Sequence, residues 1–243
     1  MKDALNDLIA HTVDLGFIDT IKVTGTDAET KIEAIAEDRT VVVSGRFKKA
    51  STYFAGTYGM PNLGKLKTIL GFDEYDENAT INMSYQAHDG SQVPCAIHFE
   101  TEHSDFINDY RLMSQAVVED RVKMPKFAGA TWNIDFEPKV AAIQRLKKQA
   151  GANSDQLTFT TKMDKTDLKV YFGDVSTHSA NFIFETQYNG TIQRAWAWPV
   201  KQFLAIMSSA GDKRIYISDQ GAMKITVDSG LTEYEYLLPA QRP

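Results

Sequence analysis

Residues 138–150 read PKVAAIQRLKKQA, a stretch in which a proline is followed by regularly spaced apolar residues. Pro138 is a residue that the first turn of a helix tolerates. An apolar stripe follows at helical spacing, made of Val140, Ile143, Leu146 and Ala150. We therefore predict a helix over 138–150 that ends at Gly151.

The chain continues from this helix with strands, and the first half of the sequence repeats the same plan. After the helix, strands are predicted at 157–163, 168–172 and 181–188, then a turn at Asn189-Gly190, a helix from Pro199 to Gly211, and strands at 214–218, 222–227 and 232–238. The first half gives a helix at 3–16, strands at 21–23, 31–37 and 41–47, a Gly/Pro-rich break at 56–61, a helix over 63–70, and strands at 80–86 and 93–101 around the turn Asp89-Gly90. Hairpin-linked strands alternating with single helices indicate an α+β protein with helices on antiparallel sheets. Residues 113–128 fit neither period, so we predict a domain at 1–112, a connector at 113–128 and a second domain at 129–243.

Composition and charge narrow the class of protein. The 243 residues are 43% hydrophobic and 24% charged, which is typical of a globular chain and not of a disordered one. No apolar run reaches the ~18–20 residues of a membrane span, and the polar–apolar N-terminus does not read as a signal peptide. With Cys95 as the one cysteine, an intrachain disulfide is impossible, and a reducing cytoplasm is the expected compartment.

Positive charge is concentrated on three predicted helices although the chain carries a net charge of −6. Residues 1–128 hold 13 basic and 20 acidic side chains, whereas residues 129–243 hold 13 and 12. Acidic residues are absent from 62–72, 138–154 and 198–211. Solvated helix faces commonly carry Lys and Arg, but three acid-free helices in an acidic protein favour a shared positive surface. Such a surface suits phosphate contacts that do not read base sequence.

Three segments resemble the sliding clamps of DNA replication. They are LGKLKTILGF (63–72), VKMPKFA (122–128) and EYEYLLPA (233–240). The order of elements is similar to that of the two-domain clamps of T-even-like bacteriophages and of proliferating cell nuclear antigen (PCNA). The resemblance implies a DNA-clamp fold with two similar domains, three protomers closing a six-domain ring, and helices lining the hole. It further implies a non-enzymatic processivity factor that encircles duplex DNA, tethers the replicative polymerase and is loaded by an ATP-dependent clamp loader.

This interpretation assigns two sets of residues. The expected DNA-facing residues are Lys65, Lys67, Arg145, Lys147, Lys148 and Lys201. The acidic first helix, with Asp3, Asp7 and Asp14, departs from the basic helices that the family usually places there. The expected partner-binding pocket, between the connector and the C-terminal tail, consists of Val117, Val118, Val122, Met124, Tyr236, Leu237, Leu238, Pro239 and Ala240. Because Pro239 cannot donate a ladder hydrogen bond, we expect the last strand to fray there and to leave the tail available.

Enzymatic alternatives rest on weaker patterns. A small α+β hydrolase could use His98 or the Glu-rich strand ends, and a monomer with a convergent His/Asp/Glu pocket would favour it. The run Gly59–Lys65 matches part of a phosphate-binding loop but has Leu66 where Ser or Thr should hold Mg²⁺. His98, Glu100 and His103 do not complete a metal-ligand set. We therefore predict no catalytic residues, no metal, no cofactor and no membrane partner.

Overall fold

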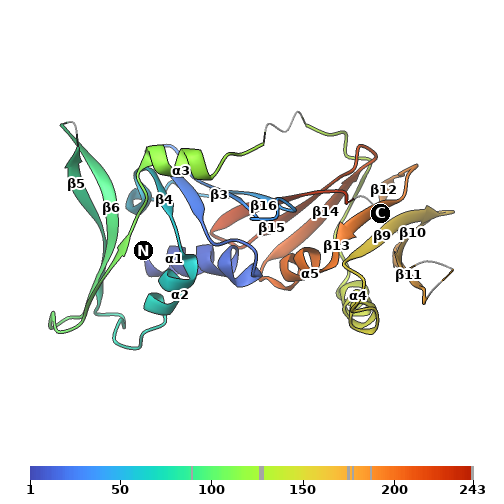
Figure 1. Ribbon diagram of the computed structural model, residues 1–243, viewed down its shortest axis with the longest axis horizontal. Coiled ribbons are helices and arrows are strands. Elements are labelled where there is room, and N and C mark those ends of the chain that lie inside the picture. The colour runs from blue at the N-terminus through green and yellow to red at the C-terminus, as the bar shows by residue number, and fades with distance from the viewer. Residues whose placement is uncertain (89, 126–128, 174–175, 177, 187, 242–243) are drawn as a thin grey trace. The chain divides into compact units, whose positions relative to one another are not determined.

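The computed structural model describes residues 1–88, 90–125, 129–173, 176, 178–186 and 188–241 (Figure 1). Its chain forms two compact units. The first comprises Met1–Pro125 together with Ser229–Tyr234, and the second comprises Lys126–Asp228 together with Glu235–Pro243. A short C-terminal segment therefore belongs to the N-terminal unit. The domain bounds expected from sequence remain a prediction.

In its described residues, the first unit contains two antiparallel sheets and three α-helices. Its elements are α1 (Lys2–Ala10), η1 (Val13–Leu15), β1 (Ile21–Gly25), β2 (Thr30–Ile35), β3 (Val42–Phe47), η2 (Thr52–Phe54), β4 (Gly56–Met60), α2 (Leu63–Leu70), β5 (Thr80–His88), β6 (Ser91–Glu100), β7 (Ile107–Arg111) and α3 (Gln115–Arg121). One sheet has the order β3-β2-β1-β4 and gains the first part of β16 (Thr232–Pro239) beside β3, and the other has the order β5-β6-β7. Helices α1 and α2 lie side by side (Figure 1) and bury Leu5, Leu8, Leu63 and Leu66 completely.

The second unit repeats this plan with α4 (Val140–Ala152) and α5 (Val200–Ser208) as its helix pair. Its strands are β8 (Ile134–Phe136), β9 (Thr158–Asp164), β10 (Asp167–Phe172), β11 (Ala180–Glu185), β12 (Asn189–Gly190), β13 (Trp196–Pro199), β14 (Asp212–Ser218), β15 (Ala222–Asp228) and the rest of β16. They form the sheet β12-β8-β14-β15-β16 and the sheet β11-β10-β9-β13. Rings of Phe159, Phe184 and Phe203 meet beneath the second of these sheets, where α4 and α5 pack. The predicted α+β class, with two helices on antiparallel sheets in each half, is confirmed.

The segment predicted to be an irregular connector contains a helix. In α3, Val118 is completely buried and Val122, one turn later, is 4% exposed. Gly59 on β4 permits this contact, since a Cβ atom there would lie 2.7 Å from Val118 Cγ2. Seven residues are too few for a helical period to stand out in the sequence. Residues 126–128, which belong to the expected connector, lie outside the described residues.

Several predicted boundaries were wrong for local reasons. Helix α4 continues through Gly151 and ends at Ala152, and the side-chain amide of the next residue, Asn153, donates to the Gln149 carbonyl at 2.8 Å. Val140 is 77% exposed and Ala142 replaces it on the buried face. The predicted turn Asn189-Gly190 is the short strand β12, paired with β8, and Gly190 has φ of 91°.

Short strands were also missed, and the first helix is shorter than expected. The break expected at 56–61 is the edge strand β4, and β7, β8 and β13 were not predicted. The helix expected over 3–16 ends at Ala10, where the Thr12 hydroxyl donates back to the Leu8 carbonyl at 2.6 Å. This kind of back-bonding competes with continuation of the helix. Residue 89, in the predicted turn Asp89-Gly90, and residue 187, in the strand predicted at 181–188, are outside the described residues.

Candidate nucleic-acid and partner interfaces

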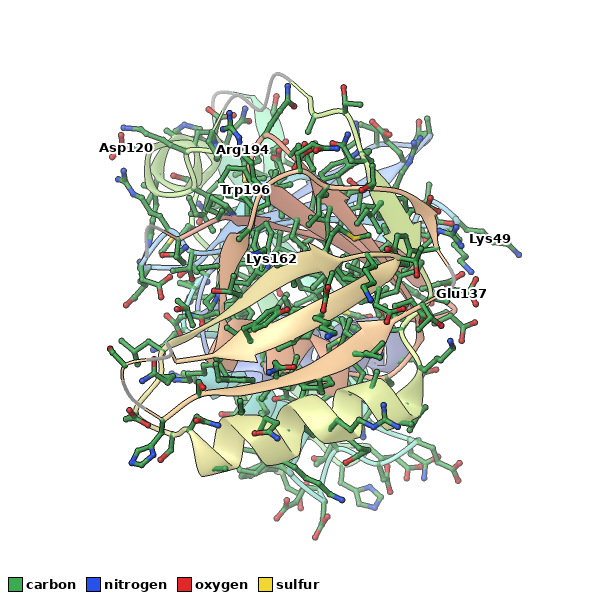
Figure 2. All side chains as sticks on the ribbon, turned by 90° about the vertical axis from the view of Figure 1, so that its right-hand side faces the viewer. Lys49, Asp120, Glu137, Lys162, Arg194 and Trp196 are labelled. Atoms are coloured by element: carbon green, nitrogen blue, oxygen red, sulfur yellow. The ribbon has the colours of Figure 1, made fainter. Side chains whose placement is uncertain are left out.

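Helix α4 presents an exposed basic face. Ala142, Ile143 and Leu146 are buried against the sheet, and Arg145, Lys147 and Lys148 are exposed. The helix has no acidic residue along its thirteen positions. Figure 2 looks onto the four-stranded sheet with α4 running along one side of it. The positive charges of α4 therefore face away from the core of their own unit.

The other predicted DNA-facing lysines are also exposed, but one of them is paired. Lys65 and Lys67 flank the buried stripe of α2, and Lys201 is exposed on α5. Lys67 Nζ lies 2.7 Å from Asp14 Oδ1. Within the described part of the chain, it is the one member of the set of six that forms an ion pair. Five cationic side chains thus remain free to meet an anionic ligand.

Two of the acidic residues in the segment predicted as the first helix, Asp7 and Asp14, have partners inside the first unit. The Asp7 side chain is only 8% exposed and accepts a hydrogen bond from the Tyr234 hydroxyl at 2.9 Å. The ring of Tyr234 stacks on that of His11 with centroids 4.6 Å apart, and His11 Nδ1 is 3.4 Å from Asp7 Oδ1. Asp14 pairs with Lys67. Asp7 therefore anchors the C-terminal strand, which explains an acid on a helix where the family resemblance implies basic ones.

Some of the residues predicted for the partner pocket are buried, and the others are accessible to solvent. Val118, Val122, Tyr236 and Leu238 lie in the cores of their units, so a ligand cannot contact them in the folded chain. Val117 is 53% exposed, and Met124, Leu237, Pro239 and Ala240 are at least partly accessible.

The expected fraying at Pro239 is wrong. β16 extends through Pro239, and the residues after it are bonded. The Ala240 N–H donates to Gly221 and the Gln241 N–H donates to Ala197, both at 2.9 Å. The tail is therefore fixed onto the second unit.

Sequence reasoning missed an aromatic patch on the second unit, made of Trp132, Tyr216 and Lys224. Lys224 Nζ lies 4.6 Å from the ring centroid of Tyr216 and 5.3 Å from that of Trp132. The two rings are 6.0 Å apart, and Lys224 also reaches Glu235 on β16 at 3.4 Å. Alternation within β14 and β15 indicates that Tyr216 and Lys224 point away from the core. Their meeting depends on the register of the two strands, which the sequence does not reveal.

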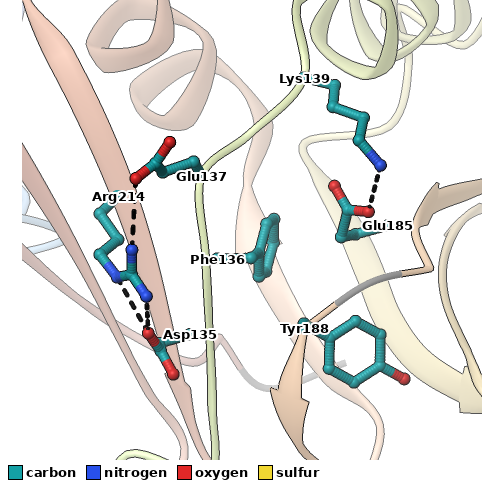
Figure 3. Close-up of a pocket in the computed structure, with 7 residues that line it drawn as sticks. All are labelled: Asp135, Phe136, Glu137, Lys139, Glu185, Tyr188 and Arg214. Atoms are coloured by element: carbon teal, nitrogen blue, oxygen red, sulfur yellow. Dashed lines mark hydrogen bonds and ion pairs between the residues drawn. The ribbon is translucent and has the colours of Figure 1, made fainter.

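A polar pocket of about 260 Å³ in the second unit bears on the enzymatic alternative (Figure 3). Seven residues line it: Asp135, Phe136, Glu137, Lys139, Glu185, Tyr188 and Arg214. Arg214 bonds Asp135 and Glu137, while Lys139 Nζ lies 2.6 Å from the buried Glu185 carboxylate. The Tyr188 hydroxyl donates to the Thr166 carbonyl at 2.8 Å. The charged groups thus pair with one another.

His98, the histidine considered for a hydrolase, is bonded by two carboxylates. Its Nδ1 is 2.9 Å from Asp109 Oδ1 and its Nε2 is 3.2 Å from Glu100 Oε2. The hydrogen bonds that His98 makes to Asp109, and secondly to Glu100, raise its pKa. Across the described residues no three His, Cys, Asp or Glu side chains are grouped to hold a metal ion. No described helix combines the length and apolar character needed to cross a bilayer.

Comparison with solved structures identifies the fold. No family model and no curated protein sequence matches the chain. Entamoeba histolytica PCNA is similar with a TM-score of 0.68 and 15% identity, covering 99% of this chain and 94% of that one. A. fulgidus PCNA, solved with the C-terminal region of FEN-1, is similar with a TM-score of 0.66 and 11% identity, covering 100% of this chain and 95% of that one. Thermococcus kodakaraensis PCNA is similar with a TM-score of 0.66 and 14% identity, covering 99% of this chain and 97% of that one. The chain therefore has the PCNA-type clamp fold along its whole length.

Proposed function

We propose that this chain is a non-enzymatic sliding clamp, a processivity factor that encircles duplex DNA and tethers a replicative polymerase. The observation that carries the proposal is the PCNA-type fold over nearly the whole chain, combined with exposed basic faces on α2, α4 and α5. Clamps work by topology, so they need few phosphate contacts and no base readout. The six predicted DNA-facing side chains all lie on helices, and only Lys67 among them forms an ion pair in the described part of the chain, which suits that requirement.

Ring closure would use two sheet edges that have no further strand beside them among the described residues, and a second copy of this chain would pair with each edge. Strand β7 ends the sheet β5-β6-β7, and strand β11 ends the sheet β11-β10-β9-β13. Both strands expose an isoleucine, Ile107 at 51% and Ile183 at 38%. Unpaired edges invite pairing with another chain, and pairing β7 of one copy with β11 of the next is a head-to-tail contact that can close a ring. Two units per chain give six units in a homotrimer.

The proposed partner site lies on the second unit, beside the outward face of β16. The accessible residues Leu237, Pro239 and Ala240 would combine with Trp132 and Tyr216, while Val117 on α3 and Met124 remain candidates on the first unit. A similar structure holds the C-terminal region of FEN-1, which supports a peptide as the ligand. Polymerase and clamp loader would each present an apolar or aromatic anchor to this surface. An ATP-dependent loader would open the ring.

The family resemblance further points to a bacteriophage replication protein that works in the host cytoplasm. The single cysteine, Cys95, is compatible with that reducing compartment.

Two measurements test the clamp. Light scattering at micromolar concentration should give a mass near three times 27.2 kDa. The protein should then thread onto a linear duplex and, once both ends are blocked with streptavidin, stay on it at high salt. Ionic binding would be lost at high salt, whereas a topological link would persist. Equal release from blocked and open duplexes would refute encirclement.

Charge reversal tests the DNA-facing set. Arg145→Glu with Lys148→Glu should reduce loading onto the duplex and leave the fold intact, since exposed substitutions usually change stability by at most ~0.5 kcal/mol. Lys162→Glu with Lys165→Glu, on β9 and in the turn that follows it, changes the charge equally at two exposed lysines and serves as the matched control. Loading that falls equally in both variants would contradict the assignment of α4 to DNA.

A further inference from the structure

The His98 cluster, defined as His98, Glu100 and Asp109, lies on the partly exposed face of the β5-β6-β7 sheet. The three side chains are 29%, 29% and 45% exposed. An imidazole that donates to a carboxylate from each nitrogen carries a proton on both, and is therefore a cation. The two bonds raise the pKa of His98, and the bond from Ser104 and that from His98 lower the pKa of Glu100. The cluster is thus held together by one titratable positive charge.

The His98 cluster links β6 to β7, the strand at the edge of its sheet. Asp109 lies on β7 directly opposite His98, and Glu100 lies opposite Ile107. On the inner face, Asn108 donates to the Tyr75 hydroxyl at 2.7 Å and Tyr110 bonds the Pro61 carbonyl, which fix β7 to the core. On the outer face, the cluster joins β7 to β6. A strand of a second copy that pairs with β7 would therefore lie directly beside Asp109.

The surroundings of the cluster are acidic. The residue that faces His98 from β5 is the uncharged Asn82. The turn between β6 and β7 contributes Glu102, His103 and Asp105, and Arg111 is the cation at the far end of β7. Strand β11, which would approach from a second copy, reads ANFIFE and brings no cation of its own. His98 is consequently the cation that directly bonds both carboxylates.

We propose that closure of the ring through β7 is controlled by protonation of His98, so that copies associate more tightly as the pH falls. Pairing at this edge removes water from Asp109, which is on β7, and burying a carboxylate is costly unless a cation stays bonded to it. The proton on His98 is therefore bound more tightly in the ring than in the free chain. Because assembly raises this pKa, the stabilisation of the ring is fully present below the value in the free chain and is lost as pH rises through the value in the ring. This inference rests on the proposed function, which supplies the second copy.

Sedimentation of the full chain between about pH 6 and about pH 8.5 tests the proposal. We expect the dissociation constant per interface to rise about tenfold across this range, as a difference of one pKa unit between free and assembled His98 requires. His98→Gln should give a flat profile, and His103→Gln, in the adjacent turn, should keep the wild-type slope. An equal slope in His98→Gln, or a wild-type trimer with no slope, would overturn the role of His98. A monomer at every pH would instead overturn the proposed function.

A second measurement needs no substitution. The Cε1–H resonance of His98, titrated at protein concentrations below and above the dissociation constant, should report a higher pKa in the assembled state. The same pKa at both concentrations would overturn the proposal even if the trimer itself were confirmed.

Discussion

Replacing Tyr234 by Phe removes one hydroxyl from the contact between the C-terminal segment and α1. The hydroxyl lies 2.9 Å from Asp7 Oδ2, and the Asp7 side chain is 8% exposed, so water cannot fully replace the lost donor. Hydrogen bonds to charged groups contribute about 1.5–3 kcal/mol. The ring remains stacked on His11, so the apolar packing is retained. We expect the free energy of unfolding to fall by about 2 kcal/mol.

Urea unfolding measures this loss, provided that the dependence on denaturant is unchanged. Hydrogen exchange locates it: amides of α1 and of Ser229–Tyr234 should lose protection together, while those of β14 and β15 keep theirs. Tyr216→Phe is the matched control, because its hydroxyl lies on the outward face of β14 and its ring contacts survive in Phe; it should stay within ~0.5 kcal/mol. An unchanged unfolding midpoint for Tyr234→Phe would refute the anchoring role of Asp7, as would loss of protection confined to the second unit.

Three further substitutions test other features. Gly59→Ala places a Cβ atom 2.7 Å from Val118 Cγ2, so α3 should be displaced and the free energy of unfolding should fall by about 1–3 kcal/mol. Trypsin should then cut faster at Arg121. Gly64→Ala, which has open space around it, is the control and should be stabilising. Trp132→Ala should weaken binding of a polymerase C-terminal peptide, measured by fluorescence anisotropy, at least about tenfold if it is a central anchor, and unchanged affinity would move the partner site elsewhere. Arg145→Gln should reduce the salt dependence of binding to a linear duplex by about one unit of log–log slope, and an unaltered slope would mean that Arg145 does not contact phosphate.

The long periodic elements could be predicted from sequence, and the short ones could not. The stripe Leu63, Leu66, Ile69, Leu70 matches α2 from end to end, because four buried positions in eight residues leave little choice of face. Strands β8 and β13 are three and four residues long, which is too short for alternation to be visible. The helical period predicts that Val140 belongs to the buried stripe, because it is apolar and correctly spaced. Its position at the first turn of α4 leaves it exposed instead.

The candidate site shows the same division. Exposure of Arg145, Lys147 and Lys148 follows from the helical period alone, so sequence was sufficient. Alternation in β16 indicates opposite faces for Leu237 and Leu238, but which face is the core depends on the neighbouring sheet, and Leu238 is the buried one. The pairing of Tyr216 with Lys224 is a product of strand register.

The return of Ser229–Tyr234 to the first unit has a consequence for biosynthesis. Domains generally fold in the order in which they leave the ribosome, at about 5–20 residues per second. Here the segment that completes the N-terminal sheet, Ser229–Tyr234, is translated only after Lys126–Asp228 of the second unit. While the ribosome makes that stretch, β3 lacks its neighbour and is open to pairing with a nascent chain on the same polysome.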